Sequence, residues 1–364
     1  MRAAIALGAR GLGMTAPNPS VGCIILDHNN RVIGRGVTGR GGRPHAEAAA
    51  LQQAQDHASD RLAGATAYVT LEPCAHHGKT PPCADALAAS GVKRVVSAME
   101  DPDSRVAGRG HERLRAAGIA VETNVLRDEA GQSHIGHLRR ILLGRPFLTV
   151  KLAISLDGRI ATRAGESQWI TSKAAREKVH LMRTQHDAVM IGIGTALADD
   201  PLLTVRLPGL VDRRPVRIVL DSNGRLSPKA KLLNNIDKLG PVWLVHGHAA
   251  PQEYLRALQD RGAVLLQVPL GADGRIDARA AMARFAKEGL TRVFCEGGGG
   301  LAATLCREGL VDRLAVVTAG KILGGDGWPA IASLDLSTLK DAPTLGLRDA
   351  WTADGEVWSL WIKK

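Results

Sequence analysis

The feature that most constrains the fold is a regular alternation of apolar runs, rich in β-branched residues, with alanine-rich stretches. In the first part of the chain the apolar runs cover 21–27, 65–71 and 92–100. The alanine-rich stretches lie between and after them, at 45–55, 83–90 and 110–118. Apolar runs bounded by glycine or polar turns predict strands, and the alanine-rich stretches predict helices. Strands and helices in this order predict an α/β layered domain with a largely parallel or mixed sheet.

The same alternation begins again after a basic, helix-like segment at 131–146. Further strand-like runs follow at 147–158, 187–195, 214–222, 241–247, 263–269, 292–298 and 313–325. Helix-like segments such as 172–184 and 301–310 lie between these runs. A chain of 364 residues exceeds the size at which one hydrophobic core usually stops growing. We therefore expect two α/β domains, one over 1–145 and a larger one over 146–364.

Composition and charge restrict the classes of partner. The net charge of +11 is spread over both halves, and aromatic residues make up only 3% of the chain, which leaves few rings on which unpaired bases could stack. A phosphorylated small substrate and cofactor suit this charge better than nucleic acid. The first residues, MRAAIALGARGLG, are too short and too interrupted for a signal peptide or a span. We expect a cytoplasmic protein with no nucleic-acid or membrane partner, and five cysteines without an export signal argue against disulfides.

Two short motifs indicate a metal centre. PHAE at 44–47 opens a predicted helix, and LEPCAHHGKTPPC at 71–83 holds two cysteines, each at the end of a predicted element. One imidazole (His45) and two thiolates (Cys74 and Cys83) form a zinc site whose fourth position is left for water, as in catalytic zinc sites. Glu47 would lie beside that water and carry protons to a leaving amine. Ordinary surface or core roles, or a structural zinc finger that uses His76 or His77, are the competing interpretations.

Zinc-dependent base deaminases share the pattern H-x-E followed by P-C-x-x-C. The present chain has HAE and PC, but eight residues rather than two separate Cys74 from Cys83. With APNPSVGCIIL and GVKRVVSAMEDPDSRVAGRG, these motifs resemble the deaminase half of the bifunctional deaminase/reductase family of riboflavin biosynthesis. The resemblance implies a cytidine-deaminase-like α/β/α domain, one Zn²⁺ per chain on His45, Cys74 and Cys83, and Glu47 as the catalytic proton carrier. It also implies substrate contacts at Asn18 and Lys79, which would otherwise be a turn residue and a solvated loop lysine.

The stretches VKLAISLDGRIAT, GESQWITS, LMRTQHDAVMIGIGTALADDPLLTVR and FCEGGGGLAATL resemble the reductase half of the same family. Glycines between a strand and a helix expose backbone N–H groups, which suits the diphosphate of a cofactor. The resemblance implies a dihydrofolate-reductase-like α/β domain that binds NADPH. The implied cofactor contacts are Ala153, Trp169, Thr195, Asp199, Ser222, Gly298, Gly299, Gly300, Leu301, Ala302, Ala303 and Thr304. The implied substrate contacts are Lys151, Ser167, Arg183, Leu203, Arg206 and Glu296.

For the second domain we expect hydride transfer from NADPH to the opened ribosyl chain of a small phosphorylated pyrimidine. Lys151 and Glu296 are our candidates for moving the accompanying proton, and Arg183 and Arg206 for binding the phosphate bidentately. We expect a homo-oligomer, with a dimer favoured. The alternative function is a nucleoside, nucleotide or tRNA base deaminase with a non-catalytic accessory domain, and the cysteine spacing argues against it.

Overall fold

The computed structural model describes residues 1–76 and 81–364 and divides into two compact units, Met1–Arg145 and Pro146–Lys364. The first unit is built on a sheet with the strand order β2-β1-β3-β4-β5. β1 pairs antiparallel with β2 and β3, whereas β3, β4 and β5 are parallel. Its strands are β1 (Gly22–Leu26), β2 (Val32–Val37), β3 (Thr66–Val69), β4 (Arg94–Ser97) and β5 (Ala120–Glu122).

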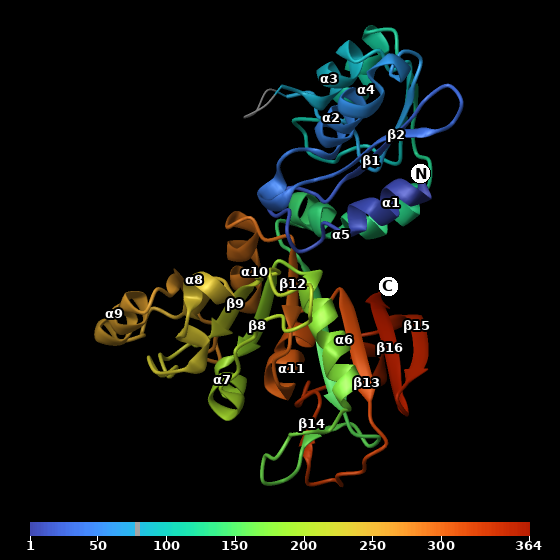
Figure 1. Ribbon diagram of the computed structural model, residues 1–364. Coiled ribbons are helices and arrows are strands. Elements are labelled where there is room, and N and C mark those ends of the chain that lie inside the picture. Colours follow the sequence, from blue (N-terminus) through green and yellow to red (C-terminus); the bar gives the residue numbers. More distant parts are fainter. Residues whose placement is uncertain (77–80) are drawn as a thin grey trace. The chain divides into compact units, whose positions relative to one another are not determined.

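Helices cover both faces of this sheet. They are α1 (Arg2–Ala9), α2 (Ala46–Ala58), α3 (Cys83–Ala89), α4 (Arg109–Ala116) and α5 (Arg127–Leu143). Figure 1 shows α1 and α5 on one face and α2, α3 and α4 on the other. This is the α/β/α layering expected from the sequence.

Helix α2 packs unusually close to β2 because two glycines remove the side chains between them. A Cβ at Gly36 would lie 1.9 Å from the carbonyl oxygen of Ala46, and one at Gly34 would lie 2.2 Å from that of Ala50. Neither position therefore accepts a larger residue without moving the helix. The contact fixes the start of α2, and with it His45 and Glu47, against the sheet.

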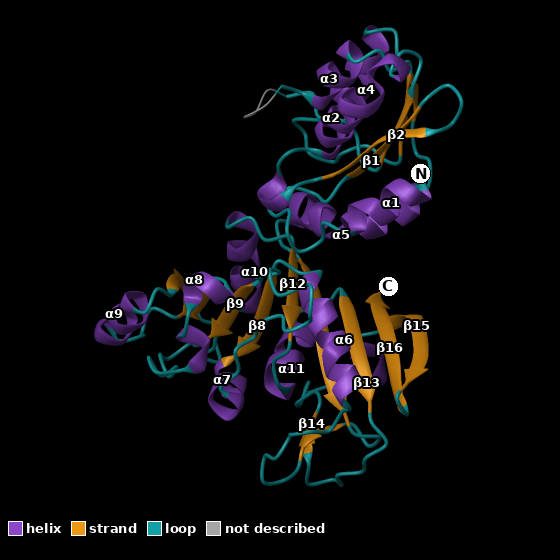
Figure 2. Cartoon of the chain, viewed as in Figure 1, coloured by secondary structure: helices purple, strands orange, loops and turns teal. Residues whose placement is uncertain are grey.

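The second unit is built on a larger sheet with the strand order β11-β10-β9-β8-β12-β6-β13-β16-β15. Figure 2 shows its strands in orange. The strands from β11 to β13 are parallel to their neighbours, and β16 and β15 extend the sheet antiparallel. They are β6 (Phe147–Ile154), β8 (Ala188–Gly192), β9 (Val216–Leu220), β10 (Val242–His246), β11 (Val264–Gln267), β12 (Arg292–Cys295), β13 (Arg313–Thr318), β15 (Leu345–Ala353) and β16 (Glu356–Lys363). A small separate ladder joins β7 (Arg159–Ala161) to β14 (Trp328–Pro329).

Both faces of the larger sheet are buried, and its central strands divide their side chains between two cores. Met190 and Val293 contribute to one core, whereas Ile191 and Phe294, the next residues, contribute to the other. The helices are α6 (Lys173–Thr184), α7 (Ile193–Asp199), α8 (Ile236–Leu239), α9 (Gln252–Asp260), α10 (Ala278–Lys287) and α11 (Gly299–Arg307). Residues of α10 and α11 enter the first core, and residues of α6, α7 and α9 enter the second. Burial on two faces explains why these strands read as continuous apolar runs.

The α/β fold class expected from the sequence is confirmed for both units, but several elements differ from expectation. The run at 187–195 ends as a strand at Gly192 and continues as α7, and the run at 313–325 is a strand only to Thr318. β2, β5, β7, β14, β15 and β16 were not expected. A turn at Asp354 and Gly355, both with positive φ, joins β15 to β16, and this Asp-Gly pair is a hairpin signal in the sequence.

Across the described residues, no helix combines the length and the apolar character needed to cross a bilayer.

A buried histidine makes the stability of the second unit sensitive to acid. His186 follows α6, is 2% exposed, and stacks on Phe294 with ring centroids 5.0 Å apart. Its Nδ1 lies 2.7 Å from the carbonyl oxygen of Met182 and its Nε2 lies 2.9 Å from Oγ1 of Thr149. Burial lowers the pKa of His186 from 6.5 to about 3. The ring therefore stays neutral in the folded protein.

We predict that the free energy of unfolding of this unit falls by up to about 1.4 kcal/mol per pH unit as the pH falls from about 6.5 toward about 3. The reason is that only the unfolded chain binds a proton on His186 in this range. His186→Gln should be less stable than the unchanged protein at pH 7.5, and this deficit should shrink by pH 5.5. All six tryptophans lie after residue 146, so tryptophan fluorescence in urea reports this unit alone. A deficit that does not change with pH would contradict the prediction.

Candidate active sites

Three metal-binding side chains converge in the first unit. His45 is the N-cap of α2, Cys74 follows the carboxyl end of β3, and Cys83 is the first residue of α3. The His45 Nδ1 lies 3.3 Å from Cys83 Sγ and 3.6 Å from Cys74 Sγ. The donor atoms all lie within 4.8 Å of one another.

These distances fit a tetrahedral zinc ion. With Zn–S near 2.3 Å and Zn–N near 2.05 Å, tetrahedral angles place nitrogen and sulfur about 3.6 Å apart. The observed separations of 3.3 and 3.6 Å are close to this value without any rearrangement. A set of one imidazole and two thiols is also the borderline-soft set that zinc prefers. His45, Cys74 and Cys83 can therefore hold zinc, with room for a fourth ligand.

The protonation of the two sulfurs favours metal binding as well. A hydrogen bond from the Cys83 thiol, joined by the Cys83 backbone N–H at 3.3 Å, lowers the pKa of Cys74 to about 4. The same contact raises the pKa of Cys83. Cys74 is thus a thiolate at neutral pH, and the two sulfurs share a single proton that a metal ion would displace.

Glu47 lies in the first turn of α2, two residues after His45, and is only 4% exposed. Burial, followed by the negative charge of Cys74, raises the pKa of Glu47 to about 7. A carboxyl group that gains and loses its proton near neutral pH is suited to proton transfer. The structure therefore places a buried acid–base group directly beside the metal donors.

The remaining residues expected in the first site have different positions. Asn18 donates its Nδ2 to the carbonyl oxygen of Gly42 at 3.0 Å, which anchors it to the loop that leads to His45. His76 is half-buried, and within the described residues it is not part of the donor cluster. Lys79 and His77 lie outside the described residues.

A second acidic cluster, Glu72 with Glu100 and His111, has a structural explanation. The carboxylate of Glu72 accepts backbone N–H groups of Asp101, Gly108, Gly110 and His111 at 2.8–3.2 Å. It therefore ties the start of α4 to the segment that carries Cys74. Sequence reasoning did not identify Glu72, although it belongs to the same LEPC motif as Cys74.

The second unit contains a cavity of about 1200 Å³. Most of the residues expected at the reductase site line it, although they come from distant parts of the chain. These are Lys151, Ala153, Ser167, Trp169, Arg183, Thr195, Asp199, Leu203, Arg206, Ser222, Glu296, Gly298, Gly299, Gly300, Leu301 and Thr304. Ala302 and Ala303 do not line the cavity. Each is 1% exposed, because they lie on the buried side of α11.

The glycine run at the start of α11 forms one wall of this cavity. A Cβ at Gly299 would lie 2.4 Å from the carbonyl oxygen of Pro329, so this position requires glycine. The backbone N–H of Gly298 donates to Oγ1 of Thr195 at 3.1 Å, which joins this wall to α7. The amino end of α11 then presents backbone N–H groups and a favourable dipole to an anion.

Arg183 and Glu296 form a buried ion pair instead of two independent ligand-binding groups. The Arg183 Nε and Nη2 donate to the two carboxylate oxygens of Glu296 at 2.6 and 3.0 Å, and Nη1 donates to the carbonyl oxygen of Thr204 at 2.6 Å. Burial opposes ionisation of Glu296, but Arg183 overcomes this effect and lowers the pKa of the carboxyl group. The bidentate face of Arg183 is thus already occupied, contrary to its expected use on a phosphate.

Two other basic side chains line the same end of the cavity. Arg206 is exposed, and its backbone N–H donates to Nδ1 of His180 at 3.3 Å. Burial lowers the pKa of Lys151, even though the charge of Glu296 opposes this effect. His180, which sequence reasoning missed, has its pKa lowered to about 4 by burial and by Arg183 and is neutral at pH 7. Only its position on α6, one turn before Arg183, could have suggested it.

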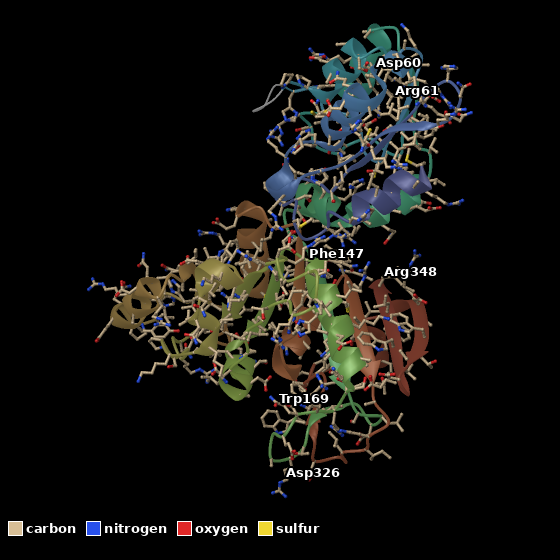
Figure 3. All side chains as sticks on the ribbon, in the orientation of Figure 1. Asp60, Arg61, Phe147, Trp169, Asp326 and Arg348 are labelled. Carbon is tan, nitrogen blue, oxygen red and sulfur yellow. The ribbon has the colours of Figure 1, made fainter. Side chains whose placement is uncertain are left out.

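Trp169 lies on the loop between β7 and α6, where Figure 3 labels it. The side chain is 58% exposed, and the Arg176 guanidinium lies 4.3 Å from the centroid of its ring. Leu203 is only 3% exposed and combines a core role with a place in the cavity wall.

Comparisons with known families match both halves of the chain. Residues 1–99 match the cytidine and deoxycytidylate deaminase zinc-binding region. Residues 146–357 match the RibD C-terminal domain. The His45, Cys74 and Cys83 cluster therefore lies in a zinc-binding deaminase region, and the cavity lies in a reductase domain.

Relatives cover nearly the whole chain. The riboflavin biosynthesis protein RibD of Escherichia coli (strain K12) is 42% identical over 360 residues, which span 96% of this chain and 94% of that protein. A solved structure of RibD from Acinetobacter baumannii is 37% identical, with a TM-score of 0.88. The match covers 100% of this chain and 97% of that one. A diaminohydroxyphosphoribosylaminopyrimidine deaminase/5-amino-6-(5-phosphoribosylamino)uracil reductase from Thermotoga maritima is 32% identical with a TM-score of 0.86, at 100% and 97% coverage. The chain therefore belongs to the RibD family of bifunctional deaminase/reductases of riboflavin biosynthesis.

Proposed function

We propose that the chain catalyses two consecutive reactions on one phosphorylated pyrimidine. The first unit would deaminate 2,5-diamino-6-(5-phosphoribosylamino)pyrimidin-4(3H)-one. The second would reduce the ribosyl chain of the product, 5-amino-6-(5-phosphoribosylamino)uracil, to ribityl with NADPH. The observation that carries the proposal is the convergence of His45, Cys74 and Cys83 beside the buried Glu47, in a chain whose other half holds a separate cavity.

In the deamination, water adds to the ring carbon that bears the amino group, and the carbon–nitrogen bond then breaks to release ammonia. His45, Cys74 and Cys83 would hold a zinc ion, which would supply Lewis-acid activation of the water. Glu47 takes a proton from the attacking water and delivers it to the departing amino group. Glu47 is only 4% exposed, which limits its contact with bulk solvent. Asn18 and Lys79 are our proposed substrate contacts.

In the reduction, the ribosylamine opens to an imine, hydride adds to its carbon and a proton adds to its nitrogen. The backbone of Gly298–Leu301 would hold the diphosphate of NADPH, which would supply the hydride. Ala153, Trp169, Thr195, Asp199, Ser222 and Thr304 are its further proposed contacts, together with Ala302 and Ala303 through their backbone. Ser167, Leu203 and Glu296 are proposed to position the substrate.

Lys151 is the better candidate for the proton donor in this step. Glu296 is ionised and bound to Arg183, so it has no proton to give, whereas Lys151 lies near it with a lowered pKa. For the substrate phosphate we favour Arg206, because Arg183 is already committed to Glu296. Arg183 then serves to hold Glu296 in place.

The competing function, deamination of nucleosides, nucleotides or tRNA bases, is tested by ammonia release. The purified protein should release ammonia from the diaminopyrimidinone in preference to cytidine and cytidine phosphates. A preference for the cytidine compounds would reverse the proposal. A homo-oligomer, with a dimer favoured, and a cytoplasmic location stay predictions from the sequence.

We predict that Glu47→Gln lowers the rate of ammonia release by at least about 100-fold, because the proton carrier is lost. Zinc content should stay at one ion per chain, and reduction of the deaminated product should be unchanged. Glu112→Gln, at an exposed position on α4, is the matched control and should retain both activities. Loss of zinc from Glu47→Gln, or retained deamination, would exclude this role for Glu47.

We predict that Lys151→Met slows NADPH oxidation at saturating product by about 100-fold and leaves ammonia release unchanged. The matched control is Lys173→Met, which removes an exposed lysine at the start of α6. A reduction rate for Lys151→Met equal to that of the unchanged protein would rule out Lys151 as the proton donor.

A further inference from the structure

One side of the cavity in the second unit is formed by a segment without regular secondary structure, residues 200–206, which we call the wall segment. Four of its residues line the cavity: Pro201, Leu202, Leu203 and Arg206. Asp200 and Leu203 have positive φ, at 38° and 54°, a conformation that residues other than glycine seldom adopt. Such a backbone persists only where the surrounding structure holds it. The contacts of the wall segment with the rest of the unit therefore decide its shape.

Two buried arginines hold carbonyl groups of the wall segment. The Arg183 Nη1 donates to the carbonyl oxygen of Thr204 at 2.6 Å. The Arg217 Nη1 donates to that of Leu202 at 3.4 Å. Arg183 is 9% exposed and Arg217 is fully buried, and a buried cation is costly unless hydrogen bonds satisfy it. These contacts fix the middle of the wall segment, whereas Arg206 lies at its end and is exposed.

His180 makes the contact at Arg206. It lies on α6, one turn before Arg183, and its Nδ1 accepts the backbone N–H of Arg206 at 3.3 Å. We propose that His180 is a positioning residue of the reduction, which holds Arg206 where its guanidinium meets the substrate phosphate. This inference rests on the proposed function, because it takes Arg206 as the phosphate ligand.

The state of the His180 ring suits this contact. A neutral imidazole that accepts at Nδ1 carries its proton on Nε2. Burial, followed by the charges of Arg183 and Arg206, lowers the pKa of His180 to about 4, so the ring is neutral at pH 7. An imidazolium would have no acceptor to offer and would add a third positive charge beside the two arginines. The two arginines thus favour the form of His180 that binds the Arg206 backbone.

A fixed backbone matters at Arg206 because its side chain is long and exposed. Such a side chain loses rotamer freedom when it binds a phosphate, and ordering a mobile backbone at the same time would add to the cost. The hydrogen bond to His180 restricts the backbone before the substrate arrives. Its loss should therefore weaken binding of the substrate and of the transition state equally, which raises KM and leaves kcat unchanged.

Three substitutions of His180 test the role of its acceptor in the full-length protein. His180→Asn keeps an oxygen acceptor near the position of Nδ1, His180→Gln moves it toward the position of Nε2, and His180→Leu removes it. The KM for the deaminated product should rise about tenfold in His180→Leu and His180→Gln and at most about threefold in His180→Asn. The kcat and the KM for NADPH should stay within about twofold. Equal rises in all three variants, or a lower kcat with unchanged KM, would overturn the inference.

A double-variant cycle separates positioning from a general structural role. If His180 acts through Arg206, His180→Leu should raise the KM of Arg206→Ala by less than about twofold. A general loosening of the wall segment would raise KM by the same factor with or without Arg206, and this result would overturn the inference. The matched control is His248→Leu, which removes an exposed histidine outside the cavity and should leave KM unchanged.

A binding measurement separates this inference from the proposed reduction. Titration calorimetry with ribose 5-phosphate needs no turnover, and Arg206→Ala identifies the part of the signal that belongs to this cavity. The dissociation constant of that part should rise about tenfold in His180→Leu and much less in His180→Asn. If the protein does not oxidise NADPH, the proposed reduction fails while the calorimetry still tests His180. Equal affinity of His180→Leu and the unchanged protein for ribose 5-phosphate would overturn the inference.

Discussion

Parallel strands end at the same edge of a sheet, and both sites of this protein are built on that constraint. Cys74 follows the carboxyl end of β3 in the first unit. In the second unit Thr195, Ser222 and Glu296 follow β8, β9 and β12, which are neighbours in the sheet although they are far apart in sequence. Ligands of open α/β sheets bind in the crevice beyond these strand ends. The topology therefore brings together functional residues that lie far apart in the sequence.

The first site needs a second constraint, because His45 and Glu47 lie at the start of helix α2. Gly34 and Gly36 allow the backbone of α2 to approach β2 so closely that the start of the helix cannot shift. Glu72 holds the segment that carries Cys74 against α4 through its carboxylate. A metal site with donor separations near 3.5 Å tolerates little movement, and both supporting contacts are made to backbone atoms, which have little freedom.

Sequence patterns predicted the elements that carry strong periodicity or a motif. The runs over 147–158 and 292–298 were recognisable because burial on both faces makes them continuously apolar, and His45, Cys74 and Cys83 could be grouped from residue chemistry. β2 was not predicted because its glycines, which allow α2 to pack closely, have low strand propensity. Most strand-end residues of the second unit rested on resemblance, since no local pattern shows which strands are neighbours. The pairing of Arg183 with Glu296 depends on that tertiary arrangement, and a phosphate role for Arg183 seemed reasonable without it.

One chain of this family deaminates a substrate and then reduces the product of that same reaction. The most direct measurement follows ammonia release and NADPH oxidation together, starting from the diaminopyrimidinone. Ammonia should appear first, NADPH oxidation should follow after a lag, and the totals should reach a one-to-one ratio. Ammonia release should continue when NADPH is omitted. Oxidation of NADPH without prior ammonia release, or ammonia release with no oxidation of NADPH at all, would contradict the account.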